Sequence, residues 1–141
     1  MSKNETNLVF SLSVPSTSFL NSANFKVLDG RKCVIQYSYE LEEDSKIVIE
    51  KLLFFGVESY KCTYYKSCSL EMLSAYDNIL EIKGSNWLTN ITENLVNAKK
   101  KVINLKHFRI YFDDGPCFEF ICESFELVRE QFSALDSHKT I

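Results

Sequence analysis

The strongest constraint on the fold lies near the carboxyl end of the chain, in residues 105–127, whose sequence is LKHFRIYFDDGPCFEFICESFEL. Apolar and polar side chains alternate on each side of an Asp-Gly-Pro sequence, and alternation with a period of two is typical of a half-buried strand. Asp-Gly is a favoured sequence for a hairpin turn. The segment therefore predicts an antiparallel hairpin, and with it a fold built around an antiparallel sheet.

The alternation also predicts which side chains of this hairpin share a face. One face collects apolar residues, namely Phe108, Ile110, Phe112, Phe118, Phe120 and Cys122. Burying them together requires Phe112 to lie opposite Phe118, because a slip by one residue would turn every side chain to the other face. The same register places Tyr111 opposite Glu119 and His107 opposite Glu123. The second face then carries a polar row made of His107, Arg109, Tyr111, Glu119 and Glu123.

The rest of the chain predicts further strands and a few helices. Alternating or β-branched stretches predict strands at residues 8–12, 25–27, 33–39, 47–55, 57–65 and 79–82, with the 47–55 strand covered on both faces. Helical spacing predicts a short helix after Ser69, a longer one from Trp87 to Val96 that packs on the sheet through Trp87, and a terminal helix marked by Val128, Phe132 and Leu135. The predicted architecture is α+β, a largely antiparallel twisted sheet of six to eight strands with two or three helices. One domain spans residues 1–141, with residues 1–6 and 137–141 frayed.

Composition limits the possible partners and cofactors. The chain has 141 residues, of which 45% are hydrophobic and 25% charged, with a net charge of -3. This balance predicts a globular domain and argues against nucleic acid as the partner, because the background field repels phosphates. No apolar run is long enough for a membrane span or a signal peptide, which favours a cytoplasmic protein. The five cysteines form no CxxC pair, so neither a metal site nor another cofactor is predicted.

The polar row of the final hairpin is the best candidate for a ligand site. Histidine, arginine, tyrosine and carboxylates on one face could perform acid-base chemistry or hold a charged ligand. The simpler interpretation is a solvated sheet face with cross-strand ion pairs, and a cleft over the row would overturn it. Asp113-Asp114-Gly115 lacks the ligand spacing of a calcium loop and is interpreted as a turn. No catalytic residue is assigned.

A second candidate surface combines aromatic and acidic residues. The chain holds seven tyrosines, and tyrosine is enriched at protein interfaces because it offers a large contact area with a polar tip. Tyr37 and Tyr39 precede an acidic corner that can steer a basic partner. The predicted partner-binding residues are Tyr37, Tyr39, Glu40, Glu42, Glu43 and Asp44.

Three segments carry a resemblance to other proteins: Phe54-Phe55-Gly56-Val57-Glu58-Ser59-Tyr60, the helix start Ser85-Asn86-Trp87-Leu88, and the hairpin at residues 107–125. In the order of these elements, over roughly the last 90 residues, the chain resembles small single-domain bacterial proteins, some of which are described as immunity proteins that neutralise toxins. The resemblance implies a protein-binding role and assigns no functional residue.

The leading hypothesis is therefore a non-enzymatic protein-binding module in the cytoplasm, which as an immunity-type inhibitor would block a basic toxin. One alternative is a small enzyme or ligand-binding domain that uses the polar row, and a deep pocket lined by that row would favour it. Another is a structural subunit that forms a homodimer by pairing edge strands.

Overall fold

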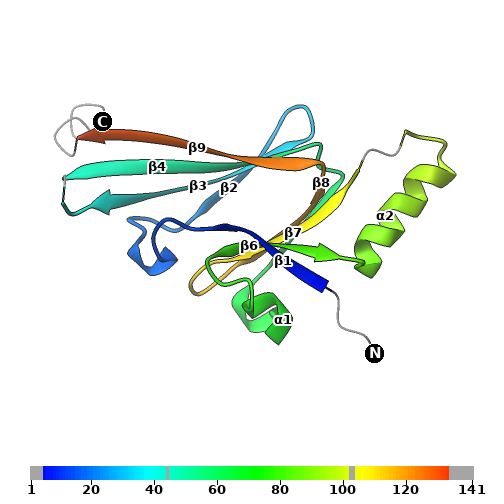
Figure 1. The fold of residues 1–141 in the computed structure, drawn as a ribbon, viewed down its shortest axis with the longest axis horizontal. Coiled ribbons are helices and arrows are strands. Elements are labelled where there is room, and N and C mark those ends of the chain that lie inside the picture. Colours follow the sequence, from blue (N-terminus) through cyan, green and yellow to red (C-terminus); the bar gives the residue numbers. More distant parts are fainter. Residues whose placement is uncertain (1–4, 44, 102–103, 134–141) are drawn as a thin grey trace.

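The computed structural model describes residues 5–43, 45–101 and 104–133, which form nine strands arranged in two antiparallel sheets (Figure 1). Sheet A has the strand order β1 (Glu5–Ser11), β6 (Asn78–Lys83), β7 (Lys106–Tyr111), β8 (Cys117–Cys122) and β5 (Ser59–Thr63). Sheet B has the order β2 (Asn24–Leu28), β3 (Lys32–Leu41), β4 (Lys46–Phe55) and β9 (Ser124–Ser133).

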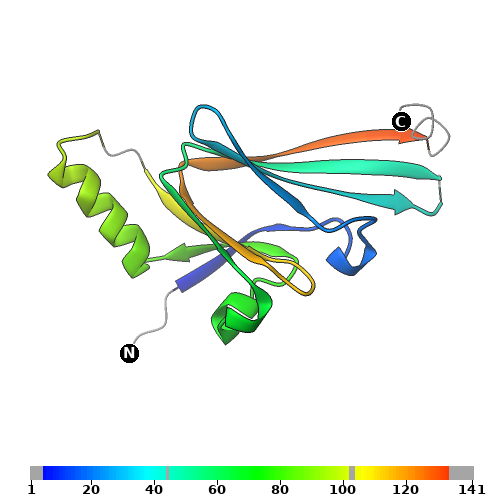
Figure 2. The same cartoon turned by 180° about the vertical axis from the view of Figure 1, so that it is seen from behind.

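The inner faces of the two sheets bury one shared core. The front and back views show how the two sheets are stacked (Figures 1 and 2). Sheet B contributes the alternate residues Cys33, Ile35, Tyr37, Tyr39, Val48, Leu52 and Phe54, and sheet A contributes Ile79, Phe108, Ile110, Phe118, Phe120 and Cys122. Phe112, in the turn between β7 and β8, completes the core. Phe54 stacks on Phe120 across the interface, with ring centroids 3.9 Å apart. The apolar face predicted for the final hairpin is thus confirmed as part of the core.

Two strands of each sheet are linked to the other sheet at one corner of the sandwich. The chain passes from β4 to β5 through Gly56, which has φ +64°, and from β8 to β9 through Glu123. The backbone N–H of Glu58 donates to the carbonyl of Ile121 at 2.8 Å, and the N–H of Glu123 donates to the carbonyl of Phe55 at 2.9 Å. These two backbone hydrogen bonds join the segments in which the chain passes from one sheet to the other.

Two short 3-10 turns and two α-helices complete the described fold: η1 (Ser16–Ser18), η2 (Tyr65–Ser67), α1 (Leu70–Leu73) and α2 (Asn86–Asn97). Both α-helices begin where the sequence predicts, because a serine hydroxyl caps each first turn. The N–H of Met72 donates to Ser69 Oγ at 3.2 Å, and the N–H of Leu88 donates to Ser85 Oγ at 3.1 Å. Helix α2 projects beyond the end of the sheets and has no buried residue (Figure 1).

The α+β class and the antiparallel sheet agree with the prediction, whereas the number and grouping of the strands do not. Nine strands in two sheets replace the expected single sheet of six to eight. The predicted terminal helix is wrong, since Val128 and Phe132 belong to β9, which pairs with β4 along its whole length. The prediction for Leu135, and the fraying of residues 1–4 and 137–141, lie outside the described residues. Glu5 and Thr6, predicted to fray, belong to β1.

None of the described helices is both long enough and apolar enough to cross a bilayer.

Candidate functional site

The final hairpin forms as predicted, but its register differs by two positions. Ile110, rather than Phe112, lies opposite Phe118, because Phe112 belongs to the turn and its carbonyl accepts from the N–H of Gly115 at 2.7 Å. A shift by two leaves every side chain on its predicted face and changes only its partner. The pairings of Tyr111 with Glu119 and of His107 with Glu123 are therefore wrong. Arg109 lies opposite Glu119, and His107 lies opposite Ile121.

Three members of the predicted polar row come together in one buried network. Glu119 Oε1 accepts from Arg109 Nε at 2.8 Å and from His107 Nε2 at 2.9 Å. The exposed fractions are 3% for His107, 9% for Arg109 and 5% for Glu119. The interpretation of this row as a solvated sheet face is therefore wrong, and the network is part of the protein interior.

A serine that the sequence analysis did not assign to the site extends the network. Ser85 Oγ lies 2.9 Å from His107 Nδ1 and is 5% exposed as a residue. Since a carboxylate only accepts, His107 Nε2 carries a proton, and in a neutral imidazole Nδ1 is then the acceptor for the Ser85 hydroxyl. The same hydroxyl oxygen caps α2. The available signal was the helix cap itself, which placed Ser85 at a helix start but not beside His107.

The charge of Glu119 is stabilised where it lies. Burial by itself raises the pKa of this carboxyl, but the hydrogen bond from His107 and the positive charge of Arg109 outweigh burial and hold the pKa below its ordinary value. Glu119 is therefore ionised at neutral pH and forms a buried ion pair with Arg109. This ion pair joins β7 to β8 through side chains on their outer faces.

Side chains of α2 and β5 lie over the His107 end of the network. The Trp87 ring lies edge-on to His107 at 5.0 Å, and Lys61 Nζ lies 4.1 Å from the centroid of Trp87. Farther along β7, Tyr111 forms a separate apolar cluster with Ala75 and Cys117. Burial raises the pKa of the Tyr111 hydroxyl. Tyr111 thus shares the face of the polar row without joining its hydrogen bonds.

Glu123 does not belong to the row at all. It lies at the crossing between β8 and β9, where its Oε2 accepts from Arg31 at 2.9 Å, and Arg31 also binds Glu58 at 2.7 Å. Arg31 is half exposed, so these two ion pairs are accessible to solvent.

Three described cavities lie elsewhere, and His107, Arg109 and Glu119 line none of them. One of about 310 Å³ opens between the β2–β3 turn and the β4–β5 crossing, beside Val27, Arg31 and Tyr60. One of about 340 Å³ lies between η1 and the tip of the final hairpin, beside Phe112, Asp113 and Asp114. A third holds only about 30 Å³. In the part of the chain that the structure describes, no three His, Cys, Asp or Glu side chains gather as metal ligands.

The predicted aromatic part of the partner surface is interior. Tyr37 and Tyr39 are 3% and 2% exposed and belong to the core, which leaves them no surface to offer a partner. Glu40, Glu42 and Glu43 are exposed at the β3–β4 turn, as expected of an acidic corner. Asp44 lies outside the described residues.

Beside these tyrosines lies a buried carboxylate that the sequence analysis missed. Glu50 is fully buried, and its Oε2 accepts from Arg129 Nε at 2.7 Å and from Ser13 Oγ at 3.3 Å. Glu50 Oε1 and the Tyr37 hydroxyl are buried without a hydrogen-bond partner among the described residues. Burial, followed by the charge of Glu50, raises the pKa of Tyr37. Only the antiparallel pairing of β4 with β9 brings Arg129 opposite Glu50.

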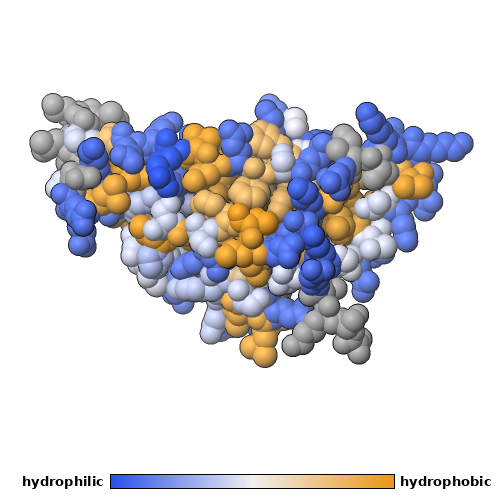
Figure 3. All heavy atoms as spheres, viewed as in Figure 1, coloured by the Kyte–Doolittle hydropathy of each residue, from blue (hydrophilic) through white to orange (hydrophobic). Residues whose placement is uncertain are grey.

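Several large side chains that reach solvent lie on or beside α1 and η2, whereas Tyr60, which is 46% exposed, belongs to β5. Three tyrosines and one leucine near α1 and η2 are strongly exposed, namely Tyr64 at 74%, Tyr65 at 56%, Leu70 at 85% and Tyr76 at 40%. We call these four residues the tyrosine surface. Apolar atoms are visible over α1 at the lower edge of the molecule (Figure 3).

Comparison with known proteins identified no relative: no family model matches the chain, no curated protein matches its sequence, and no solved structure matches its fold.

Proposed function

We propose that this chain is a non-enzymatic, cytoplasmic protein-binding module that engages a basic partner through the tyrosine surface. The observation that carries the proposal is the exposure of three tyrosines and a leucine together, on short elements that leave their side chains uncovered. Interfaces take most of their binding energy from a few large side chains, among which tyrosine is enriched.

The elements that carry the tyrosine surface pack against buried side chains. Beneath it, Ala75, Tyr111 and Cys117 form a buried cluster against which Met72 and Leu73 of α1 pack. The hairpin tip is also close, because a β-carbon added to Gly115 would lie 3.1 Å from the backbone nitrogen of Tyr65. A preorganised surface loses little conformational entropy on binding, which favours affinity.

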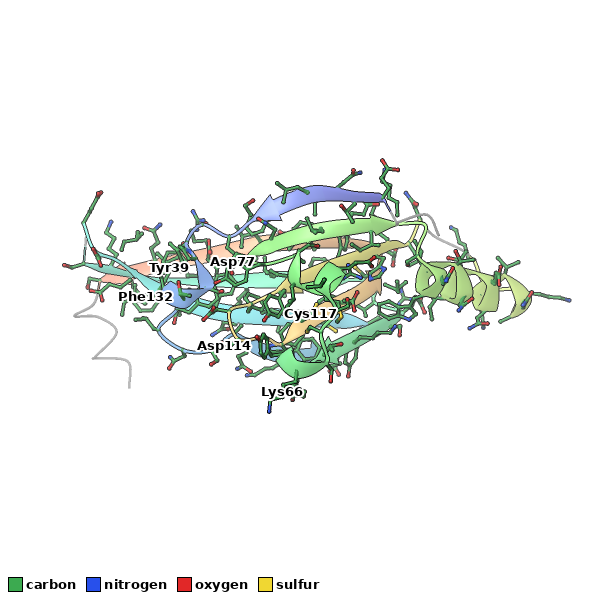
Figure 4. All side chains as sticks on the ribbon, turned by 90° about the horizontal axis from the view of Figure 1, so that it is seen from below. Tyr39, Lys66, Asp77, Asp114, Cys117 and Phe132 are labelled. Carbon is green, nitrogen blue, oxygen red and sulfur yellow. The ribbon has the colours of Figure 1, made fainter. Side chains whose placement is uncertain are left out.

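Acidic residues border the tyrosine surface and indicate the charge of the partner. The Tyr76 hydroxyl donates to Asp113 Oδ1 at 3.1 Å, and Asp113 and Asp114 are both exposed at the hairpin tip. In the view from below, Asp114 and Lys66 lie near α1 on the same side of the molecule (Figure 4). With Glu71 also exposed on α1, carboxylates outnumber the single lysine here. A basic protein surface is the complement of such a patch.

The acidic corner at Glu40, Glu42 and Glu43 adds to this field from the far end of sheet B, at the left of Figure 1. Its expected contribution is to the rate of association, since charges outside the contact act mainly by steering.

The test compares the chain with a double variant, Tyr65→Ala with Leu70→Ala, in affinity capture from extract of the cells that encode it. Both side chains are exposed, so the variant should keep the fold, which circular dichroism checks. Leu8→Ala with Val96→Ala serves as the matched control, because these apolar side chains are 61% and 57% exposed on other elements.

The expected result is a protein captured by the wild type and by the control but not by the double variant. Binding of that purified protein should then weaken by at least tenfold on Tyr65→Ala and should fall as salt is raised. Equal capture by all three chains, or no capture by any, would reject the proposal.

The narrower form of the proposal is an immunity-type inhibitor, supported by the small size, the net negative charge and the resemblance described above. In that case the captured protein is a toxin, and the chain abolishes its activity at a one-to-one ratio. A captured protein whose activity is unchanged by the chain would rule out this form and leave protein binding intact.

A second candidate function is acyl transfer, favoured by the order of hydrogen bonds from Ser85 through His107 to Glu119. Hydrolytic triads have the same order of groups, in which a histidine oriented by a carboxylate accepts the serine proton, with the two imidazole nitrogens in the reverse roles to those of His107. A fluorophosphonate probe tests it directly. Covalent labelling that is lost in Ser85→Ala and in His107→Gln would support catalysis, and an unlabelled wild-type chain would reject it.

A further inference from the structure

The outer face of sheet B is an exposed sheet surface with an apolar centre. Each strand of the sheet alternates, and its outward residues are those that do not enter the core. Ile47, Ile49, Leu53 and Phe55 of β4 point outward and are partly exposed, as are Val128 and Phe132 of β9. The prediction that both faces of this strand are covered thus holds for one face only.

No described helix lies over this face. The two sheets are stacked with sheet A below, and α1, α2 and both 3-10 turns lie beside or below sheet B in both ribbon views (Figures 1 and 2). A row of partly exposed isoleucine, leucine and phenylalanine side chains on a sheet face that no described helix covers is a common feature of protein interaction sites.

The face is large enough for a stable interface. Three strands of ten residues and one of five, β2, at about 3.3 Å per residue and about 4.8 Å apart, cover on the order of 550 Å² in projection. Each partner of a stable complex contributes about 800 Å², and projecting side chains add to the projected area.

Charge on this face is polarised from one side to the other. The β2–β3 side carries Lys26 and Lys32, both exposed, with Lys32 Nζ 5.8 Å from the Phe55 ring. Glu40 of β3 also faces outward, but it lies at the opposite end of that strand from Lys32. The β9 side carries Glu126 and Glu130, also exposed. Lys51 lies between them on β4. The register of β2 with β3, β3 with β4 and β4 with β9 puts all of these residues on the outward face.

We infer that the outer face of sheet B binds a second copy of this chain, face to face, in a symmetric dimer. A two-fold axis that lies in the interface parallel to β4 brings the lysine side of each copy against the glutamate side of the other. An axis across the strands would instead set glutamates against glutamates. The polarity therefore selects one arrangement, in which two aligned sheets bury Ile49 and Leu53 at the centre.

The dimer is independent of the tyrosine surface, which lies on elements outside sheet B. Failure of one proposal leaves the other standing, because Tyr65→Ala removes no residue of the dimer face.

Sedimentation equilibrium of the full chain is the first test, and it should report twice the mass of one chain, shifting to the monomer on dilution and at high salt. Two charge variants then probe the arrangement. The acidic variant carries Lys26→Glu and Lys32→Glu, and the basic variant carries Glu126→Lys and Glu130→Lys. Each alone should be monomeric at concentrations where the wild type is dimeric, with dissociation constants raised at least tenfold.

Mixing the two variants supplies the decisive result. In the mixed pair, the new glutamates of the acidic variant face the new lysines of the basic variant, and the unchanged glutamates and lysines also face each other. The mixture should therefore form a heterodimer although neither variant dimerises alone. Recovery in the mixture also shows that both variants are folded. A chain carrying Glu5→Lys and Glu93→Lys, two exposed residues off this face with the same change of charge as the basic variant, should dimerise like the wild type.

A wild-type chain that stays monomeric at all concentrations would overturn the inference. So would an acidic variant that stays dimeric, since a dimer formed by edge pairing of β9 leaves Lys26 and Lys32 outside the contact.

Discussion

Gly56 lies directly against the side chain of Glu123, so that a β-carbon added at residue 56 would overlap the Glu123 carboxylate. This contact joins the two crossings between the sheets, and Glu123 is held there by its ion pair with Arg31. A residue with no side chain is needed at Gly56 both for the positive φ and for the space.

Replacement of Gly56 by alanine should therefore destabilise the protein. The positive φ costs a residue with a β-carbon about 1 kcal/mol, and displacing Glu123 from Arg31 adds up to about 1 kcal/mol. Urea denaturation measures the loss. Gly84→Ala is the matched control, because Gly84 has φ +72° and nothing within 4 Å of an added β-carbon. An equal loss in the two variants would show that the contact with Glu123 carries no cost.

Removing Arg109 from the buried ion pair should lower the free energy of unfolding far more than removing Arg31 from its exposed ion pairs. Arg109→Met leaves the Glu119 carboxylate buried beside a neutral group, and a loss of about 3 to 5 kcal/mol is expected. The double variant Arg109→Met with Glu119→Met should lose less than the single variant, since no charge remains unpaired. Arg31→Met serves as the exposed comparison, with an expected loss below about 1 kcal/mol in the same urea titration. Similar losses from Arg109→Met and Arg31→Met would contradict the buried assignment.

Stability should fall in acid partly through Glu119. Its pKa in the folded protein lies below the ordinary value for a glutamate carboxyl, so its ionisation contributes stability that is complete above the unfolded pKa. That contribution is lost as pH falls through the lower folded pKa. The free energy of unfolding should thus decline more steeply below about pH 4.5 in the wild type than in Glu119→Gln, as measured by denaturation at a series of pH values. Parallel pH profiles would argue against a depressed pKa.

The five cysteines should differ in reactivity toward a thiol reagent. Cys33, Cys117 and Cys122 are buried, and burial raises the pKa of Cys122 to about 12. Because the thiolate is the reactive form, these three should react only after unfolding. Cys62 is exposed and should react first in the native protein, and Cys62→Ser should remove that fast phase. Fast labelling of four or five thiols in the native state would contradict the burial described here.

The polar row shows where prediction from the sequence reaches its limit. Alternation correctly assigned His107, Arg109 and Glu119 to one face, since the period of a strand depends only on neighbours in the chain. The burial of His107 depends on contacts with Trp87 and Ser85, which lie some twenty residues upstream. The register was set by the turn, where Phe112 bonds to Gly115, and no alternation pattern distinguishes registers that differ by two.

Strand β9 shows the same limit for secondary structure. Val128 and Phe132 have helical spacing, yet ten backbone pairs with β4 determine the conformation of this segment. Such pairing satisfies backbone groups and buries Phe125 and Leu127 against the core, and these gains outweigh a weak local preference.

The sequence by itself determined the position of most strands, the serine-capped helix starts, the turns and the apolar face of the final hairpin, because each depends on residues close together in the chain. Only the tertiary structure decided the division into two sheets, the pairing of Arg109 with Glu119, the burial of Tyr37 and Tyr39, and the exposure of the tyrosine surface. Those features depend on which distant segments meet, and that is decided by the burial of the whole core at once.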